Sequence, residues 1–284
     1  MQPLVNSNAD NPAGATVAAL LRDNALPRLE RTLLLAHVLG STRESILAHP
    51  ERGLDGQQVR RFEHLRERRV RGEPIAYLIG WREFHGLRLM VTPDVLIPRP
   101  ETEGLVAAAL ERLPPDQLRR VLDLGTGSGA AAIAVANERH NAQVHAVDIS
   151  AAAVALAERN VAKHALRNVT CQVSDWYSAC AGRYDVVISN PPYVDEGDPH
   201  LEQGDVRFEP RLALTSGSDG LDAIRLIVAQ ARDFLCAGGW LLLEHGFNQA
   251  AQCRQLMQQA GFDCISTDGD LAGIERITCA RSPR

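Results

Sequence analysis

From Arg120 onward the chain alternates short apolar runs with helix-like segments, and no other feature constrains the fold as strongly. Seven strands are expected, at residues 121–124, 144–147, 169–173, 186–189, 240–244, 262–266 and 274–279. Helices are expected after Ser128, Ser150, Asp219 and Phe247. Such alternation predicts an α/β fold in which helices cover both faces of a mostly parallel sheet. No helical segment separates the last two strands, so we expect them to form an antiparallel hairpin at one edge.

The first hundred residues carry a different pattern. Apolar residues recur at helical spacing between residues 14 and 71, which predicts a small helical domain. From residue 74 to 98 the pattern changes to short β-like runs between glycines, including 76–79 and 84–91. A chain of 284 residues also exceeds the usual size of one domain. We therefore expect a helical domain at 1–73, a β-hairpin linker at 74–98 and the larger α/β domain at 99–284, whose first helix begins near Glu101 and Thr102.

Composition is typical of a soluble globular protein, with 45% hydrophobic and 23% charged residues. The longest apolar stretches are shorter than the roughly 20 residues that a membrane helix needs. Residues 1–12 are polar and lack a signal-like apolar core, so a cytoplasmic location without a membrane partner is expected. The six cysteines are widely spaced, with no Cys-x-x-Cys and no paired histidines nearby. We therefore expect reduced thiols and no metal site.

The net charge of −5 is shared unevenly along the chain. Residues 1–115 hold 15 basic and 14 acidic side chains, whereas residues 116–284 hold 15 and 21. The acidic larger domain argues against stable, direct binding to nucleic acid. The most basic segment, residues 60–71, alternates arginines with Glu63 and Glu67, which is typical of a solvated, salt-bridged helix face. A docking surface for a large partner is the alternative reading of this segment.

A glycine-rich turn follows the first expected strand of the sheet. It reads Asp123-Leu-Gly-Thr-Gly-Ser-Gly129 and opens an alanine-rich helix. Glycines let the backbone turn sharply and approach a ligand, whose carboxylate or ribose then faces free N–H groups of the helix. The candidate binding residues are Gly125, Thr126, Gly127, Ser128 and Gly129. Alone, this pattern is compatible with several nucleotide ligands and with a tight turn that binds nothing.

The next two strand ends carry residues that suit a nucleoside. Asp148 ends the second strand roughly 20 residues beyond the glycines, where an acid binds ribose hydroxyls. After the third strand, Asp175 can accept from an adenine amine and Trp176 can cover the ring, although simple packing also explains the tryptophan. The glycine spacing differs from the dinucleotide pattern Gly-x-Gly-x-x-Gly, and no arginine is obviously placed for a pyrophosphate. S-adenosylmethionine therefore fits these residues better than NAD.

The tetrapeptide Asn190-Pro191-Pro192-Tyr193 comes directly after the fourth expected strand. Asn190 offers a side-chain carbonyl oxygen, and Pro191, with no N–H and a fixed φ, can turn its own carbonyl into the cleft. Two such acceptors can take both protons of one planar NH2 group, while Tyr193 supplies a flat stacking surface. We predict that Asn190, Pro191, Pro192 and Tyr193 form the catalytic centre. The alternative is a proline-stiffened turn with no chemical role.

These motifs resemble the class I S-adenosylmethionine methyltransferases that act on planar amines. Flanking segments narrow the resemblance, which runs in order from about residue 20 to about residue 280. The segments are 72–78 (Gly-Glu-Pro-Ile-Ala-Tyr-Leu), 82–84 (Arg-Glu-Phe), 96–103 (Leu-Ile-Pro-Arg-Pro-Glu-Thr-Glu), 209–210 (Glu-Pro), 217–221 (Gly-Ser-Asp-Gly-Leu) and 243–246 (Leu-Glu-His-Gly). Together they are similar to the HemK-type (PrmC) glutamine methyltransferases of peptide-chain release factors.

The resemblance implies a helical substrate-docking domain, a hairpin linker and a seven-stranded catalytic domain of Rossmann-like topology. It implies methyl transfer from S-adenosylmethionine to N5 of the glutamine in the Gly-Gly-Gln motif of class I release factors. Residues 125–129, Asp148, Trp176 and Asn190 would contact the cofactor, and residues 190–193 would hold the glutamine.

Three other functions stay open. A sibling family methylates a glutamine of a ribosomal protein and shares the tetrapeptide, whereas segments 100–103 and 198–201 look like the release-factor branch. A DNA or RNA amino-methyltransferase would use the same acceptors on an exocyclic amine, but it needs a basic groove. The third is a module that binds S-adenosylmethionine and docks on a translation component without catalysis.

Overall fold

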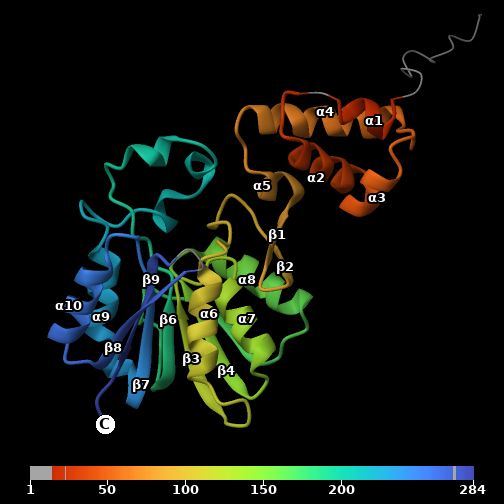
Figure 1. The fold of residues 1–284 in the computed structure, drawn as a ribbon. Helices are drawn as coiled ribbons and strands as arrows, with labels where there is room; N and C mark the ends of the chain where they lie inside the picture. The colour runs from red at the N-terminus through yellow and green to blue at the C-terminus, as the bar shows by residue number, and fades with distance from the viewer. Residues whose placement is uncertain (1–14, 23, 271–272) are drawn as a thin grey trace, which may run out of the picture. The chain divides into compact units, whose positions relative to one another are not determined.

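The computed structural model describes residues 15–22, 24–270 and 273–284. The polar stretch 1–12, and with it the start of the expected helical domain, lies outside the described residues. The chain divides into two compact units, Met1–Gly80 and Trp81–Arg284 (Figure 1). Among the helices that the structure describes, none combines the length and the apolar character of a membrane span. All six cysteines are free.

The first unit is helical, as its apolar spacing predicts. Its elements are α1 (Val17–Leu20), α2 (Arg28–Leu39), α3 (Arg43–Ala48), α4 (Gly56–Val70) and α5 (Ile75–Ile79). A capping box begins α4: Asp55 accepts from the Gln58 amide at 2.8 Å, and the Gln58 side chain accepts from the Asp55 amide at 3.0 Å. The core of this unit is formed by buried residues of α2 and α4, among them Leu34, Leu35 and Phe62.

The expected β-like run at residues 76–79 is wrong, because these residues lie in α5. Pro74 immediately precedes this helix, and Gly80 ends it in the left-handed conformation, with its N–H donated to the Ala76 carbonyl at 2.8 Å. Four apolar residues do not distinguish a strand from a buried helical turn. The proline before them and the glycine after them are the signals that decide for a helix.

An antiparallel hairpin opens the second unit. Its strands are β1 (Trp81–Phe84) and β2 (Leu87–Met90), with Phe84 paired to Leu87. The two turn residues, His85 and Gly86, both have positive φ, at 49° and 72°. Two such residues match the right-handed twist of the flanking strands, so a hairpin forms here as expected.

The second unit is built on a seven-stranded sheet with the order β5-β4-β3-β6-β7-β9-β8. The strands are β3 (Arg119–Leu124), β4 (Ala142–Asp148), β5 (Val169–Val173), β6 (Tyr184–Ser189), β7 (Leu235–Glu244), β8 (Asp263–Gly269) and β9 (Glu275–Arg281). Strands β3 to β7 pair in parallel, whereas β9 is antiparallel to both β7 and β8. The expected sheet and its antiparallel edge hairpin are confirmed.

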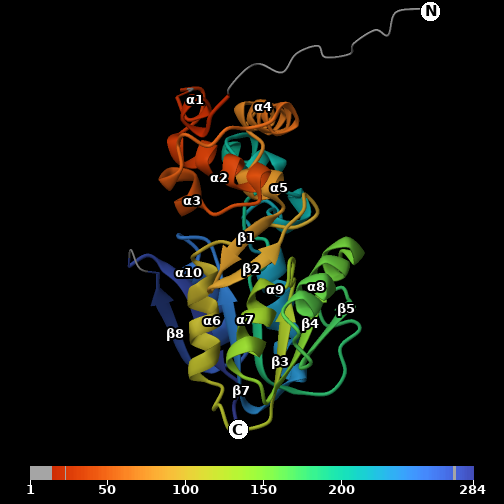
Figure 2. The ribbon, with the colours of Figure 1, turned by 90° about the vertical axis from the view of Figure 1, so that its right-hand side faces the viewer.

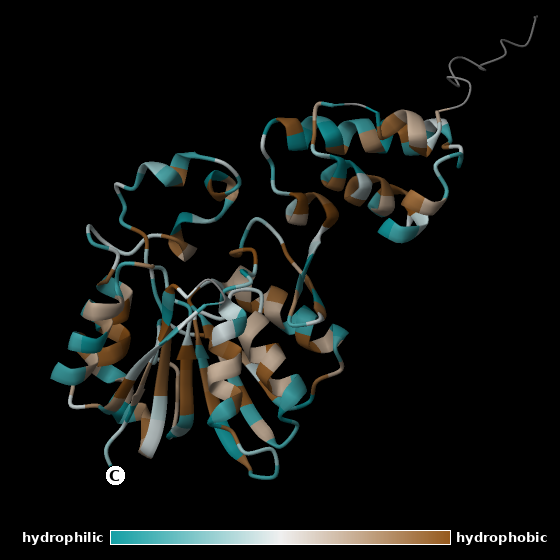
Figure 3. Cartoon of the chain, viewed as in Figure 1, coloured by the Kyte–Doolittle hydropathy of each residue, from teal (hydrophilic) through white to brown (hydrophobic). Residues whose placement is uncertain are grey.

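Helices cover both faces of this sheet. They are α6 (Thr102–Glu111), α7 (Ala130–Glu138) and α8 (Ala151–Lys163) on one face, and α9 (Asp222–Phe234) and α10 (Ala250–Gln259) on the other (Figures 1 and 2). Successive side chains of a strand point to opposite faces of the sheet, so each strand contributes to a hydrophobic core on either face. On β3, Val121 belongs to the core under α6 and α7, whereas Leu122 and Leu124 belong to the core under α9. Hydrophobic residues accordingly gather in the strands (Figure 3).

The strand order of the sheet changes direction at β3: β4 and β5 lie on one side of it, and β6 and the later strands lie on the other. Strand β4 pairs with one side of β3 and β6 pairs with the other. Leu124, the last residue of β3, lies opposite Val147 of β4 and Ser189 of β6. Asp148 and Asn190 each follow one residue later, so they flank the end of β3. Open α/β sheets bind ligands at such a point.

Candidate active site

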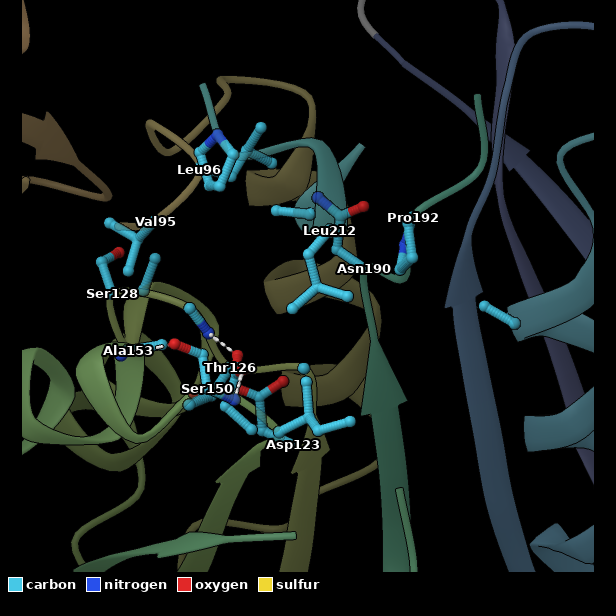
Figure 4. A pocket seen from close by; sticks show the side chains of 18 of the residues that line it. Val95, Leu96, Asp123, Thr126, Ser128, Ser150, Ala153, Asn190, Pro192 and Leu212 are labelled. Carbon is cyan, nitrogen blue, oxygen red and sulfur yellow. Dashed lines mark hydrogen bonds between the residues drawn. The ribbon is translucent and has the colours of Figure 1, made fainter. Parts of the chain in front are cut away.

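A cavity of about 550 Å³ lies at this end of the sheet. Its wall includes residues from the turns after β3, β4, β5 and β6, and from the loop 210–216 (Figure 4). A volume of this size suits a small organic ligand or a cofactor. The predicted residues that line it are Gly125, Thr126, Gly127, Ser128, Asp148, Asp175, Trp176, Asn190 and Pro192.

The glycine turn closes over the end of β3 and begins α7. Gly129 is the cap residue of α7, with φ 83°, and a Cβ atom there would lie 3.0 Å from Ile133 Cδ1 and 3.2 Å from Ala157 Cβ. A side chain at this position is therefore excluded both by backbone strain and by close packing. Gly127, also at positive φ, donates its N–H to Asp148 Oδ2 at 2.9 Å. The predicted turn is thus tied to the predicted acid.

Asp148 sits between two backbone donors. Its Oδ2 accepts from Gly127 and its Oδ1 accepts from the Ser150 amide, each at 2.9 Å. Burial raises the pKa of this carboxyl, and these amide hydrogen bonds oppose the rise. Each carboxylate oxygen can accept more than one hydrogen bond, so the group keeps acceptor capacity toward the cavity. This suits it to a pair of ribose hydroxyls.

Asp123, which was not among the predicted site residues, is part of the same wall. The carboxyl is buried, and its Oδ2 accepts from Thr126 Oγ1 at 2.6 Å and from the Ala132 amide at 3.2 Å. Burial raises its pKa to about 6. These bonds join the end of β3 to both the glycine turn and the first turn of α7. The sequence did carry a local signal for this role of Asp123, because an acid directly before a glycine-rich turn has unpaired backbone amides within its reach.

Trp176 and Asp175 lie in the turn after β5. Trp176 is half-buried, and its ring lies against the glycine turn, with Cζ3 3.7 Å from a Cβ atom placed on Gly125. The Ser174 hydroxyl donates to the Trp176 carbonyl at 2.7 Å and holds this turn. Asp175 is exposed at the cavity, where its carboxylate can accept hydrogen bonds. Both residues line the cavity, where Trp176 offers an aromatic surface and Asp175 an acceptor.

The tetrapeptide follows β6 as expected. Asn190 Nδ2 donates to Thr102 Oγ1 at 3.0 Å, and in the described chain neither Asn190 Oδ1 nor the Pro191 carbonyl accepts a hydrogen bond. Asn190 and Pro192 line the cavity (Figure 4). Pro191 is buried, and Tyr193 packs on the core under α9, with its hydroxyl 3.5 Å from Glu244 Oε1. Two consecutive residues at the end of β6 therefore each keep a free acceptor, although Pro191 and Tyr193 are not among the residues that line the cavity.

Two buried side chains that were not predicted as site residues fasten the segment after β6. Gln249 Nε2 donates to the Tyr193 carbonyl at 3.0 Å, and its Oε1 accepts from the Gly246 amide at 2.8 Å. Glu209 accepts from the Ile97 amide at 3.1 Å and from Arg99 Nη2 at 2.5 Å.

The Glu209 carboxyl group is completely buried, which raises its pKa, while Arg99 opposes the rise. Apart from the local bond between Gly246 and Gln249, these hydrogen bonds join residues that are far apart in sequence. They show that the wall of the cavity is held by polar side chains as well as by regular secondary structure.

The chain matches two family models and many curated proteins. Residues 15–80 match the PrmC N-terminal domain, and residues 106–205 match the methyltransferase small domain. A release factor glutamine methyltransferase of Burkholderia pseudomallei is 48% identical over 283 residues, covering 97% of this chain and 99% of that protein. One from Escherichia coli is 48% identical over 262 residues, covering 92% and 94%. The chain belongs to the release factor glutamine methyltransferases.

Solved structures agree on the fold alone. A methyltransferase of Pyrococcus furiosus has a TM-score of 0.53 at 18% identity, over 70% of this chain and 90% of that one. A T. thermophilus 16S rRNA N2 G1207 methyltransferase, in complex with AdoMet and guanosine, has a TM-score of 0.54 at 22% identity, over 71% and 49%. The expected class I methyltransferase fold and the resemblance to the HemK-type family are both confirmed.

Enzymes of this family depend on S-adenosylmethionine, and the cavity fits that cofactor. The amides of Thr126, Gly127 and Gly129 are hydrogen-bonded within the protein, so the backbone available to the cofactor is at the start of α7, where Ala130 and Ala131 line the cavity. Asp148 keeps acceptor capacity for ribose hydroxyls. The half-buried Trp176 offers an aromatic surface for the base. Among the described residues, no group of His, Cys, Asp and Glu side chains is arranged to hold a metal ion.

Proposed function

We propose that this protein transfers the methyl group of S-adenosylmethionine to N5 of the glutamine in the Gly-Gly-Gln motif of class I release factors. The observation that carries the substrate assignment is the pair of free acceptors, Asn190 Oδ1 and the Pro191 carbonyl, at the exit of β6. They suit the two protons of one carboxamide. The proposal includes a cytoplasmic location, because translation takes place there.

The roles of the cofactor residues follow from the wall of the cavity. Residues 125–128 would face the methionine part and the ribose, while the predicted Gly129 shapes the turn without lining the cavity. Asp148 would bind the ribose hydroxyls, and Asp175 with Trp176 would bind the adenine. When bound, S-adenosylmethionine supplies an electrophilic methyl group on a positively charged sulfur. The side chains of the tetrapeptide then have to bring an amide nitrogen to that methyl group and hold it there.

The two acceptors answer a specific chemical difficulty. An amide nitrogen is a poor nucleophile, because its lone pair is delocalised into the carbonyl group. Hydrogen bonds from both N–H groups to Asn190 and Pro191 stabilise the positive charge that grows on the nitrogen. Each is worth about 1 kcal/mol at rest and about 1.5–3 kcal/mol once charge develops. The gain of about 0.5–2 kcal/mol per bond, or about 1–4 kcal/mol for the pair, corresponds to a rate factor between about 5 and about 900.

Positioning contributes more than these two hydrogen bonds. Holding the reacting atoms in line removes about 7–11 kcal/mol of entropic and reorganisation cost. The rigid wall around Asn190, fastened by Thr102, Glu209 and Gln249, is built for that purpose. We assign no strong general base, since the amide proton becomes acidic once the nitrogen carries the methyl group.

We further propose that the helical unit docks the release factor. Several arginines of α4 are engaged in ion pairs, including Arg66 with Glu63 and Arg69 with Glu30, as a salt-bridged helix face requires. Arg60 and Arg61 belong to no ion pair in the described chain and line a small cavity with His37, Gln57, His64 and Leu65. These cations offer a surface for an acidic part of a protein substrate.

The test is methylation of a purified release factor followed by intact-mass analysis. One added methyl group, mapped to the loop glutamine, is the expected result. Asn190→Ala should lower the single-turnover rate by about a hundredfold while cofactor affinity changes much less. The matched control is Asn141→Ala, which removes an exposed asparagine of the same unit. An equal rate for Asn190→Ala and the control would refute the two-acceptor mechanism. Methylation of ribosomal protein, DNA or RNA in place of the release factor would refute the substrate assignment.

A further inference from the structure

A buried carboxyl group lies beside the tetrapeptide and has no part in the chemistry described so far. Glu244 ends β7 and is 1% exposed. Its Oε1 accepts from the Tyr193 hydroxyl at 3.5 Å, and its Oε2 has no hydrogen-bond partner in the part of the chain that the structure describes. A buried acid with unmet acceptor capacity is costly to the fold. Its place at the end of a strand next to the active site points to a functional reason.

Thr102 connects this acid to the predicted catalytic asparagine. It is buried, lines the cavity and is the first residue of α6. Its Oγ1 accepts from Asn190 Nδ2 at 3.0 Å. Its hydroxyl group also lies close enough to the carboxyl group of Glu244 to lower the pKa of that acid, against the larger rise that burial causes. Thr102 therefore lies between Asn190, which it contacts directly, and the buried acid.

We propose that Thr102 and Glu244 are positioning residues that hold the Asn190 side chain with its oxygen toward the substrate amide. This inference rests on the proposed function, because only an NH2 group in the cleft requires an acceptor there. An ionised carboxylate accepts hydrogen bonds and donates none. In the arrangement that we propose, the Thr102 hydroxyl donates to the ionised Glu244, and its oxygen accepts from Asn190. Asn190 then turns its NH2 group toward Thr102 and its oxygen toward the cleft.

Protonation of Glu244 removes this constraint. A neutral carboxyl can donate to Thr102 Oγ1, and the Thr102 hydroxyl can then donate to the oxygen of Asn190. A rotated Asn190 amide would present its NH2 group to the NH2 group of the substrate. Two donors that face each other form no hydrogen bond, so the substrate amide would lose one of its two acceptors.

The surroundings of Glu244 place its titration in a range that activity measurements reach. The titratable and charged groups that act on it are Glu101 beside the start of α6, Tyr193 after β6 and Arg276 on β9. His245 is the next residue in the chain, and its ring is bonded to the Gly246 carbonyl and to Thr278. Burial raises the pKa of Glu244 to about 7, Glu101 adds to the rise, and Arg276 opposes it. Burial lowers the pKa of His245. The positioned form of Asn190 should therefore gain population as pH rises through about 7.

The first experiment follows single-turnover methyl transfer to a release factor at saturating S-adenosylmethionine, across the pH range around neutrality. The wild-type rate should rise with pH as Glu244 ionises. Thr102→Val and Glu244→Gln should each lower the rate by about 10- to 100-fold and lose this rise, with little change in the KM for the release factor. Thr102→Ser keeps the hydroxyl group and should restore both the rate and the pH profile.

Thr32→Val is the matched control, because it removes a buried hydroxyl from α2. It should retain the wild-type profile. Folding of every variant is checked by its affinity for S-adenosylmethionine. A Thr102→Val protein that binds the cofactor and reacts at the wild-type rate would overturn the proposal. Persistence of the pH-dependent rise in Glu244→Gln would overturn it as well, and this variant decides the matter if Thr102→Val does not fold.

A second measurement needs no substrate. The NMR resonances of the Asn190 side-chain NH2 group, assigned by their loss in Asn190→Ala, are followed through the same pH range with S-adenosylmethionine present. They should shift with the titration of Glu244 in the wild type and stay constant in Glu244→Gln. Wild-type protein that leaves the release factor unmethylated contradicts the proposed function. An Asn190 resonance that does not respond to pH contradicts the positioning role.

Discussion

Loss of the Gln249 side chain is expected to destabilise the second unit strongly, although this residue is not expected to touch substrate or cofactor. Gln249→Leu keeps most of the volume and removes both hydrogen-bonding groups. The Gly246 amide and the Tyr193 carbonyl, which Gln249 joins at 2.8 Å and 3.0 Å, then lose this partner. Leaving a buried polar group unpaired costs about 1–3 kcal/mol, so the two groups together should lower the free energy of unfolding by about 2–6 kcal/mol.

Tryptophan fluorescence measures this loss selectively. All three tryptophans, Trp81, Trp176 and Trp240, belong to the second unit, so their emission reports the unfolding of that unit alone. Urea titration should show a lower midpoint with an unchanged slope. For a unit of this size, 1 kcal/mol corresponds to about 2–4 °C, so the melting temperature should fall by at least about 4 °C.

The control for this prediction is Gln258→Leu, an exposed glutamine on the same helix. Its change in unfolding free energy should stay within about 0.5 kcal/mol. Gly220→Ala offers an independent test, because a methyl group at Gly220 would overlap the Tyr193 carbonyl and approach Gln249 Nε2 to 2.8 Å. Both Gln249→Leu and Gly220→Ala should lower the methyl-transfer rate. Stability of Gln249→Leu equal to that of the control would show that Gln249 does not fasten the tetrapeptide.

Two further predictions concern the acids of the cofactor pocket. Asp148→Asn should weaken S-adenosylmethionine binding by about 10- to 100-fold, as measured by isothermal titration calorimetry. The reason is that the new side-chain NH2 group must face the backbone amide of either Gly127 or Ser150. Unchanged affinity would exclude Asp148 from the ribose site. Burial raises the pKa of Asp123 to about 6, so the folded state holds this proton more tightly than the unfolded chain, and stability should fall as pH rises from about 4 to about 6. Asp123→Asn should reduce that slope in a urea series, because other buried carboxyl groups also contribute to it, and an identical slope in both proteins would refute the prediction.

The parts of the fold that sequence predicts well are those whose signals are local. The strands of the sheet have apolar residues bounded by turns, and the parallel order follows from the helices between them. The glycine turn, Asp148 and the tetrapeptide were found because each directly follows or ends a strand. The prediction of a β-strand at residues 76–79 was wrong because the local signal was ambiguous. These apolar residues carry no period of their own, and only Pro74 and Gly80 mark the run as a helix.

The supports of the site escaped prediction because their partners are distant in the chain. Asn190 meets Thr102 across 88 positions, Tyr193 meets Gln249 across 56, and Glu209 meets the Ile97 amide across 112. Each pairing exists only once the sheet has brought β6, β7 and α6 together. A glutamate or glutamine inside a polar stretch of sequence carries no sign that it will be buried. Only the three-dimensional structure shows which of them hold the site.

These distant contacts answer a problem that the topology creates. Residues 190–221, all of them described, contain short 3-10 turns but no α-helix and no strand, yet this segment begins with the two acceptors. Scattered backbone bonds, such as the one from the Val194 amide to the Leu214 carbonyl, satisfy part of this segment, and side chains have to satisfy other buried backbone groups. Gln249 does so at the Tyr193 carbonyl, while the Pro191 carbonyl stays free because no side chain is placed to take it. The same fastening that orders the segment therefore leaves the acceptors available to the substrate amide, so loss of a fastening residue should reduce stability and turnover together.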